Sequence, residues 1–109
     1  MDSKTREFET LLLNSIDEAL LAIGESGRRS IYFHLENSFS IKKEMIVKKL
    51  DQFQIGLEKI FGVGARYIEI IIMKNLHSKI KKPLNGENNI SLEFLKYVEA
   101  AKQRYIEDN

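Results

Sequence analysis

The spacing of apolar residues along the chain predicts a series of helices. From Ser3 to Ile23 apolar side chains recur every three or four residues, at Phe8, Leu12, Ile16, Ala19, Leu20 and Ile23. Gly24 is well placed to cap the C-terminus of this first helix. A second helix is expected over residues 27–38 with Ser26 as its N-terminal cap, followed by a short helical turn at 44–49.

Two further apolar patterns meet at residues 62–64. Asp51 is a suitable N-terminal cap for a third helix, which Gly62 should end. A fourth helix over residues 64–80 carries apolar residues on nearly all sides, at Ala65, Tyr67, Ile68, Ile70, Ile71, Ile72, Met73, Leu76 and Ile80. Such a helix must be covered on several sides, so it is either the central helix of the domain or the contact surface of a dimer. Isoleucine-rich segments also favour strands, but a pattern of about 16 residues is too long for a typical strand.

The last part of the chain contains one clear loop and one more helix. Pro83, Asn85-Gly86 and Asn88-Asn89 predict a loop over residues 81–89. Ser91 can cap a helix over residues 92–107, and Ile90 and Leu95 have the spacing of a hydrophobic staple. The fold class predicted is therefore all-α, with about five helices in a single domain spanning residues 1–109 and the apolar helix near 64–80 at its centre.

Composition narrows the class of protein. Hydrophobic residues make up 43% and charged residues 30% of the chain, which is typical of a globular domain. The chain has no cysteine, which excludes disulfides, thiolate nucleophiles and cysteine-based metal sites. No apolar run reaches the roughly 18 residues of a membrane span, and the polar N-terminus does not resemble a secretory signal. We therefore expect a cytoplasmic protein.

Charge is distributed unevenly. The net formal charge is +1 over the whole chain, but residues 1–25 carry six acidic and two basic side chains, whereas residues 26–82 carry twelve basic and five acidic ones. A basic middle segment suits a nucleic acid or another acidic partner. It equally suits a fold or a dimer in which the acidic ends neutralise the basic middle, so both interpretations stay open at this point.

No arrangement of residues indicates an enzyme. The two histidines, His34 and His77, lie in no catalytic or metal-binding spacing, and the acidic residues of the middle segment are spread singly. A small enzyme would need a pocket that converges on one of these histidines. We predict no catalytic residue, no metal and no cofactor.

The segment Gly62-Val63-Gly64 has two interpretations. With the apolar residues before it and the helix after it, this turn resembles the helix–hairpin–helix motif of DNA repair proteins, in which backbone amides at a helix N-terminus contact DNA phosphates. Arg66 would add positive charge there, and Arg28 and Arg29 are further candidate contacts with an anion or nucleic acid. In the alternative interpretation Gly62 is a left-handed C-terminal cap and Gly64 frees the chain to begin the next helix. The aromatic residues that could stack on bases, Tyr32, Phe33 and Tyr67, lie in apolar patterns that suggest burial.

A second resemblance covers more of the chain. It rests on Gly24-Glu25-Ser26, on the segment 31–36, on the spacing of Phe53, Leu57, Gly62 and Glu69, and on residues 94–102. This pattern resembles the Nitrosopumilus output domain family and its uncharacterised archaeal relatives. The resemblance implies a helical module that acts in signalling by contact with other macromolecules, and it implies no catalytic residues.

Together these observations predict a small helical binding or regulatory module that acts through protein–protein contacts as a homodimer. Ile70, Ile71 and Met73 are the candidate dimer surface. The alternative function is a DNA-binding protein without sequence specificity that uses Gly62, Gly64 and Arg66.

Overall fold

The computed structural model describes residues 2–80 and 93–108, and confirms the all-α class. Five α-helices follow one another: α1 (Ser3–Leu21), α2 (Glu25–Phe39), α3 (Leu50–Phe61), α4 (Ala65–Lys79) and α5 (Phe94–Asp108). Two short 3₁₀ helices, η1 (Lys43–Lys48) and η2 (Gly62–Gly64), lead into α3 and α4. The predicted loop at 81–89, the cap at Ser91 and the staple residue Ile90 lie outside the described residues.

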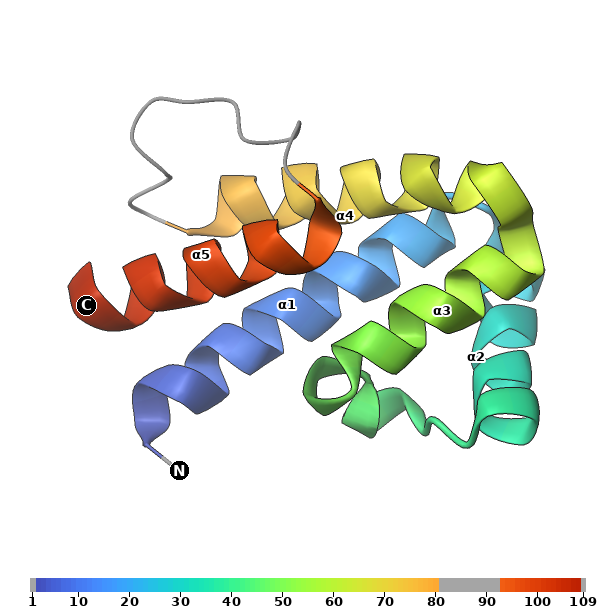
Figure 1. Cartoon of the computed structure of the whole chain (residues 1–109), viewed down its shortest axis with the longest axis horizontal. Coiled ribbons are helices and arrows are strands. Elements are labelled where there is room, and N and C mark those ends of the chain that lie inside the picture. Colours follow the sequence, from blue (N-terminus) through green and yellow to red (C-terminus); the bar gives the residue numbers. More distant parts are fainter. Residues whose placement is uncertain (1, 81–92, 109) are drawn as a thin grey trace.

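Helices α1 and α4 hold the fold together: α1 crosses the middle of the molecule, and α4 lies along one edge of it (Figure 1). They share the most extensive contact between any two elements, and the other helices pack around them: α2, η1 and α5 against α1, and α3 and α5 against α4. The 64–80 helix is therefore central in its packing contacts, as its apolar pattern predicts, but it shares that role with α1. One continuous core results, whose fully buried large side chains include Phe8, Ile16, Leu20, Leu35, Ile41, Ile46, Phe53, Leu57, Ile72, Met73, Phe94 and Tyr97.

The boundary between α1 and α2 differs from the prediction. Helix α1 ends at Leu21 with Ala22 as its cap, and Gly24 instead precedes α2 with φ of 107°. The carbonyl of Gly24 accepts a hydrogen bond from the amide of Arg28 at 2.9 Å, so α2 begins at Glu25. Ser26 consequently lies inside the first turn and does not cap the helix. The positive φ, which glycine adopts without steric cost, turns the chain here.

The start of α3 also differs. Helix α3 begins at Leu50, and no side chain caps it, so Asp51 is not its N-terminal cap. The physical reason is that η1 leads directly into α3: the carbonyl of Lys49 accepts a hydrogen bond from the amide of Phe53 at 2.9 Å. A capping side chain is not needed where the preceding turn already positions the backbone of the new helix.

A group of charged and polar side chains ties α1 to α2 and η1. The hydroxyl of Tyr32 donates a hydrogen bond to Asp17 Oδ1 at 2.7 Å, and Arg28 donates to Asp17 Oδ2 at 2.8 Å. Lys43 lies 3.4 Å from the same carboxylate and 4.9 Å from the centre of the Tyr32 ring. Partial burial alone would raise the pKa of Asp17, but the Tyr32 hydrogen bond and the charges of Lys43 and Arg28 outweigh it and lower that pKa.

We expect Asp17→Ala to lower the free energy of unfolding by about 1–2 kcal/mol at neutral pH, because it leaves the half-buried Tyr32 hydroxyl without its acceptor. Urea denaturation measures this difference. Since the native pKa of Asp17 is lowered, its contribution is present above the unfolded pKa of about 3.9 and is lost as the pH falls through the native value. The gap between wild type and variant should therefore close in acid.

Glu18→Ala is the matched control, because Glu18 is about half exposed and, within the described residues, pairs with Lys79 at 2.7 Å across the surface. An exposed pair of this kind contributes little. An equal loss of stability in both variants would contradict a special role for Asp17.

Candidate functional site

The outward side of η2 and α4 exposes a line of apolar side chains. Val63 is 95% exposed, Tyr67 74% and Ile71 36%, and the four-residue steps between them place all three on one side of the helix. Ile70 is half-buried beside them, and Lys74 continues the line one turn further on. We call these five residues the outer face. Isolated exposed apolar residues are common on proteins, whereas a contiguous row of them often marks a contact surface.

The opposite side of α4 faces the core and includes one of the predicted surface residues. Met73 is fully buried, together with Ile72 and Leu76. A helix rotates about 100° per residue, so Met73 lies about 160° around the helix from Ile71 and on the inward side with Glu69 and Leu76, while Ile70 lies at the border between the two sides. The assignment of Met73 to a dimer surface is thus corrected, while Ile70 and Ile71 keep accessible surface.

Tyr67 and Phe33, expected to be buried, are exposed, and Tyr32 is half-buried. Phe33 is 63% exposed on α2, where it contacts His34 edge-on. Tyr67 lies on the outer face. Both residues are aromatic and stand next to apolar residues in the sequence, so the sequence pattern does not separate them from their buried neighbours; only the packing of α2 and α4 does.

The turn that leads into α4 is a 3₁₀ turn with one conformationally demanding glycine. Gly62 has φ of 60° and ψ of −134°, a region open to glycine but unfavourable for other residues. Gly64 has helical angles (φ −66°, ψ −17°), and a Cβ there would meet the nearest atom, Phe61 Cβ, at an ordinary contact distance of 3.8 Å. The expectation that Gly64 is needed to free the chain is therefore corrected: only Gly62 requires its special backbone.

The cavity next to this turn is acidic. It has a volume of about 550 Å³ and is lined by Gln54, Glu58, Gly62, Val63, Ala65, Arg66, Glu69 and Glu93. Among the described lining residues, three carboxylates thus face a single guanidinium, and Arg66 lies 3.6 Å from Glu69. A phosphate placed here would meet an excess of negative charge, which opposes the anion-binding role that the turn resembles.

The other two candidate arginines are engaged elsewhere in the chain. Arg28 donates hydrogen bonds to both Asp17 and Glu25, and Arg29 lies 3.9 Å from Glu25. Both belong to α2, which packs against α1, η1 and α3. The structure thus brings Gly62, Gly64 and Arg66 together, whereas Arg28 and Arg29 form a separate group.

Acidic residues of α1 pair with four of the twelve basic residues of the middle segment. Glu9 pairs with Lys48 at 3.2 Å, Asp17 with Arg28 and Lys43, and Glu18 with Lys79 at 2.7 Å. The charge distribution had two interpretations. These ion pairs favour the one in which the acidic N-terminal segment balances the basic middle segment within the fold.

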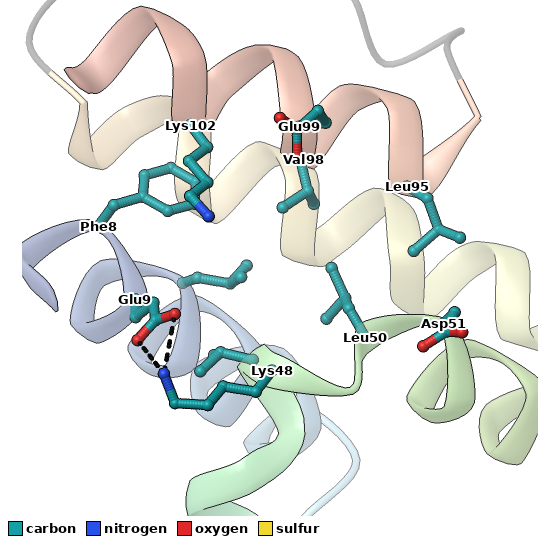
Figure 2. Close-up of a pocket in the computed structure, with 11 residues that line it drawn as sticks. Phe8, Glu9, Lys48, Leu50, Asp51, Leu95, Val98, Glu99 and Lys102 are labelled. Carbon is teal, nitrogen blue, oxygen red and sulfur yellow. Dashed lines mark hydrogen bonds and ion pairs between the residues drawn. The ribbon is translucent and has the colours of Figure 1, made fainter. Parts of the chain in front are cut away.

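A second, smaller hollow lies between α1, η1 and α5 (Figure 2). Its volume is about 250 Å³; Phe8, Leu12 and Val98 are part of its lining but are almost completely buried already. The Glu9–Lys48 ion pair crosses one wall, and Asp51, Glu99 and Lys102 add charges of both signs (Figure 2). Because little apolar surface is accessible and the charges are mixed, this hollow selects no particular ligand.

The histidines do not form a catalytic group with acidic residues in the described part of the chain. His34 is exposed and contacts Phe33, and His77 Nδ1 lies 3.4 Å from the hydroxyl of the buried Tyr97. Within residues 2–80 and 93–108 no cluster of acidic or histidine side chains could hold a metal ion. In the same ranges no helix combines the length and the apolar character needed to cross a membrane.

The fold and its surface define a small all-α domain with an exposed apolar helix face beside an acidic cavity. No family model, curated protein or solved structure matches the chain. The resemblance to the archaeal family therefore stays a prediction from the sequence pattern.

Glu69 is the one carboxylate buried in the wall of the acidic cavity. It is 4% exposed, accepts a hydrogen bond from Gln54 at 3.2 Å and lies beside Arg66. Burial raises its pKa, the hydrogen bond and the arginine oppose the rise, and the nearby Glu58 adds to it. The ionised form of Glu69 is thus less favourable in the folded protein than in the unfolded chain.

We expect Glu69→Gln to be at least as stable as wild type at pH 7 and to depend less on pH. Because the native pKa of Glu69 is raised above the unfolded value of about 4.3, its contribution to stability declines as the pH rises from that value through the native one. The amide of glutamine does not titrate, so this decline of the free energy of unfolding with rising pH should disappear in the variant. Urea denaturation from pH 4 to pH 8 tests it, with Glu36→Gln as the control, because Glu36 is exposed on α2 and does not line the cavity. A marked loss of stability in Glu69→Gln alone would show that Gln54 and Arg66 hold the charged form favourably.

Proposed function

We propose that the protein is a helical interaction module that self-associates through the outer face of α4. The observation that carries the proposal is the row formed by Val63, Tyr67 and Ile71, each at least about one-third exposed although α4 is otherwise a core helix. Covering apolar surface contributes roughly 25 cal/mol per Å² removed from water, so this row favours association.

The position of the outer face suits a protein contact. It lies on a helix whose inward side is anchored on α1, so its side chains are presented from a rigid element. Tyr67, the largest residue of the row, has an apolar ring and a polar hydroxyl, a combination enriched at protein interfaces. The archaeal family that the sequence resembles implies a role of the same kind, contact with other macromolecules.

Two copies of one face can pair through a two-fold axis, the commonest symmetry of protein dimers. A homodimer thus covers the outer faces of both chains with no second component. In this proposal Ile70 and Ile71 belong to the dimer surface, as predicted from the sequence. Val63 and Tyr67 are added to it.

We expect the wild-type protein to show concentration-dependent dimerisation in the micromolar range, and Tyr67→Ser to weaken it by at least about tenfold, because loss of a central aromatic anchor commonly costs more than 1 kcal/mol. Analytical ultracentrifugation measures the dissociation constant. Phe33→Ser is the matched control, since Phe33 is also exposed but lies on α2. A wild-type chain that light scattering shows only as monomer at these concentrations would overturn the proposal.

The DNA-binding alternative makes a different prediction. We expect no mobility shift of duplex DNA at about 50 mM salt, conditions under which binding driven by phosphate contacts is strong. The reason is that the turn at 62–64 adjoins three carboxylates and that Arg28 is held by Asp17 and Glu25. A shift that is lost on raising the salt concentration would instead support the helix–hairpin–helix interpretation.

A further inference from the structure

Lys74 and the acidic cavity are complementary in charge and lie at opposite ends of the outer face. Lys74 is exposed and makes no ion pair within residues 2–80 and 93–108. At the other end of the row, Val63 borders the cavity in which Glu58, Glu69 and Glu93 outnumber Arg66. Lys74 cannot reach its own chain's cavity mouth at Val63, because eleven residues of helix separate them by roughly 16 Å.

An antiparallel pairing of two α4 helices removes this separation. A two-fold axis that passes between Tyr67 and Ile70 sets the Tyr67 of each chain against the Ile70 and Ile71 of the other. The same operation sets residues near position 74 opposite residues near position 63, because the midpoint between positions 63 and 74 coincides with the midpoint between positions 67 and 70. Each Lys74 then lies over the other chain's Val63, at the mouth of the acidic cavity.

We propose that the occupant of the outer face is a second copy of this chain in antiparallel register, with the Lys74 ammonium of each copy placed between the Glu58 and Glu93 carboxylates of the other. This inference rests on the proposed self-association and adds its geometry and its specificity. Each contact brings one positive charge to a site with an excess of two negative charges. A parallel pairing would instead set Lys74 against Lys74 and the two acidic cavities against each other, which like-charge repulsion disfavours.

Charge reversal tests the register. In a dimer of Lys74→Glu, both contacts join acidic side chains. In a dimer of Glu58→Lys, each Lys74 meets a lysine in place of Glu58, and the excess of two negative charges in the cavity is lost. We expect each variant to raise the dissociation constant of the dimer by at least about fivefold, because every dimer contains two such contacts. In an equimolar mixture of the two variants, a mixed dimer has opposite charges at both contacts. Ultracentrifugation should therefore show stronger association in the mixture, and also in the double variant, than in either single variant alone.

Lys42→Glu is the matched control for net charge. Lys42 is exposed and immediately precedes η1, which lies on the opposite side of the molecule from α4 (Figure 1). It should leave the dissociation constant unchanged at a fixed salt concentration. Circular dichroism of each variant confirms that these exposed substitutions leave the helices intact.

The outcomes separate this inference from the function on which it rests. If Tyr67→Ser prevents dimerisation but Lys74→Glu and Glu58→Lys do not weaken it, or if their mixture associates no better than either variant alone, the antiparallel register is wrong and self-association stands. If the wild-type chain stays monomeric, both proposals fall.

Discussion

The packing of α4 on α1 is the contact on which the rest of the structure depends. Ile72, Met73 and Leu76 are fully buried, and Asn75 donates a hydrogen bond to the carbonyl of Ser15 in the middle of α1 at 3.3 Å. Because this contact fixes the rotation of α4 about its axis, it also decides which residues point outward. The exposure of Tyr67 and the position of Lys74 are thus consequences of how the core is filled.

Electrostatic pairing completes the same arrangement. The acidic residues of α1 face cations from three later elements, α2, η1 and α4, so part of the uneven charge along the chain is balanced by ion pairs in the fold. The sequence made Arg28 a candidate contact with nucleic acid. In the structure it donates hydrogen bonds to Asp17 on α1 and to Glu25 on α2, and so joins these two helices. Of the described residues that line the cavity beside η2, Arg66 is the one cation among three carboxylates, which leaves negative charge beside the apolar row.

Local patterns predicted the helices well and their caps poorly. The five helices lie within a few residues of the predicted ranges, because three-to-four-residue apolar spacing requires one buried side on each helix. Ser26 and Asp51 are residue types that often cap helices. Here, however, α2 begins directly after Gly24 and α3 just after η1, so both side chains lie inside the first turn of their helix. The sequence pattern places Met73 and Tyr67 in the wrong environments for a related reason: α4 carries apolar residues on nearly all sides, and the local sequence does not show which side faces the core.

The sequence by itself determined the all-α class, the place of each helix and the need for a special backbone at Gly62. It also indicated that α4 has more apolar surface than one neighbouring helix can cover. Only the tertiary structure decided which of those apolar residues remain exposed and that the glycine turn adjoins carboxylates from α3, α4 and the start of α5. Helical periodicity is a property of neighbouring residues, whereas exposure and local charge depend on which distant segments meet, and that is settled by packing the whole core at once.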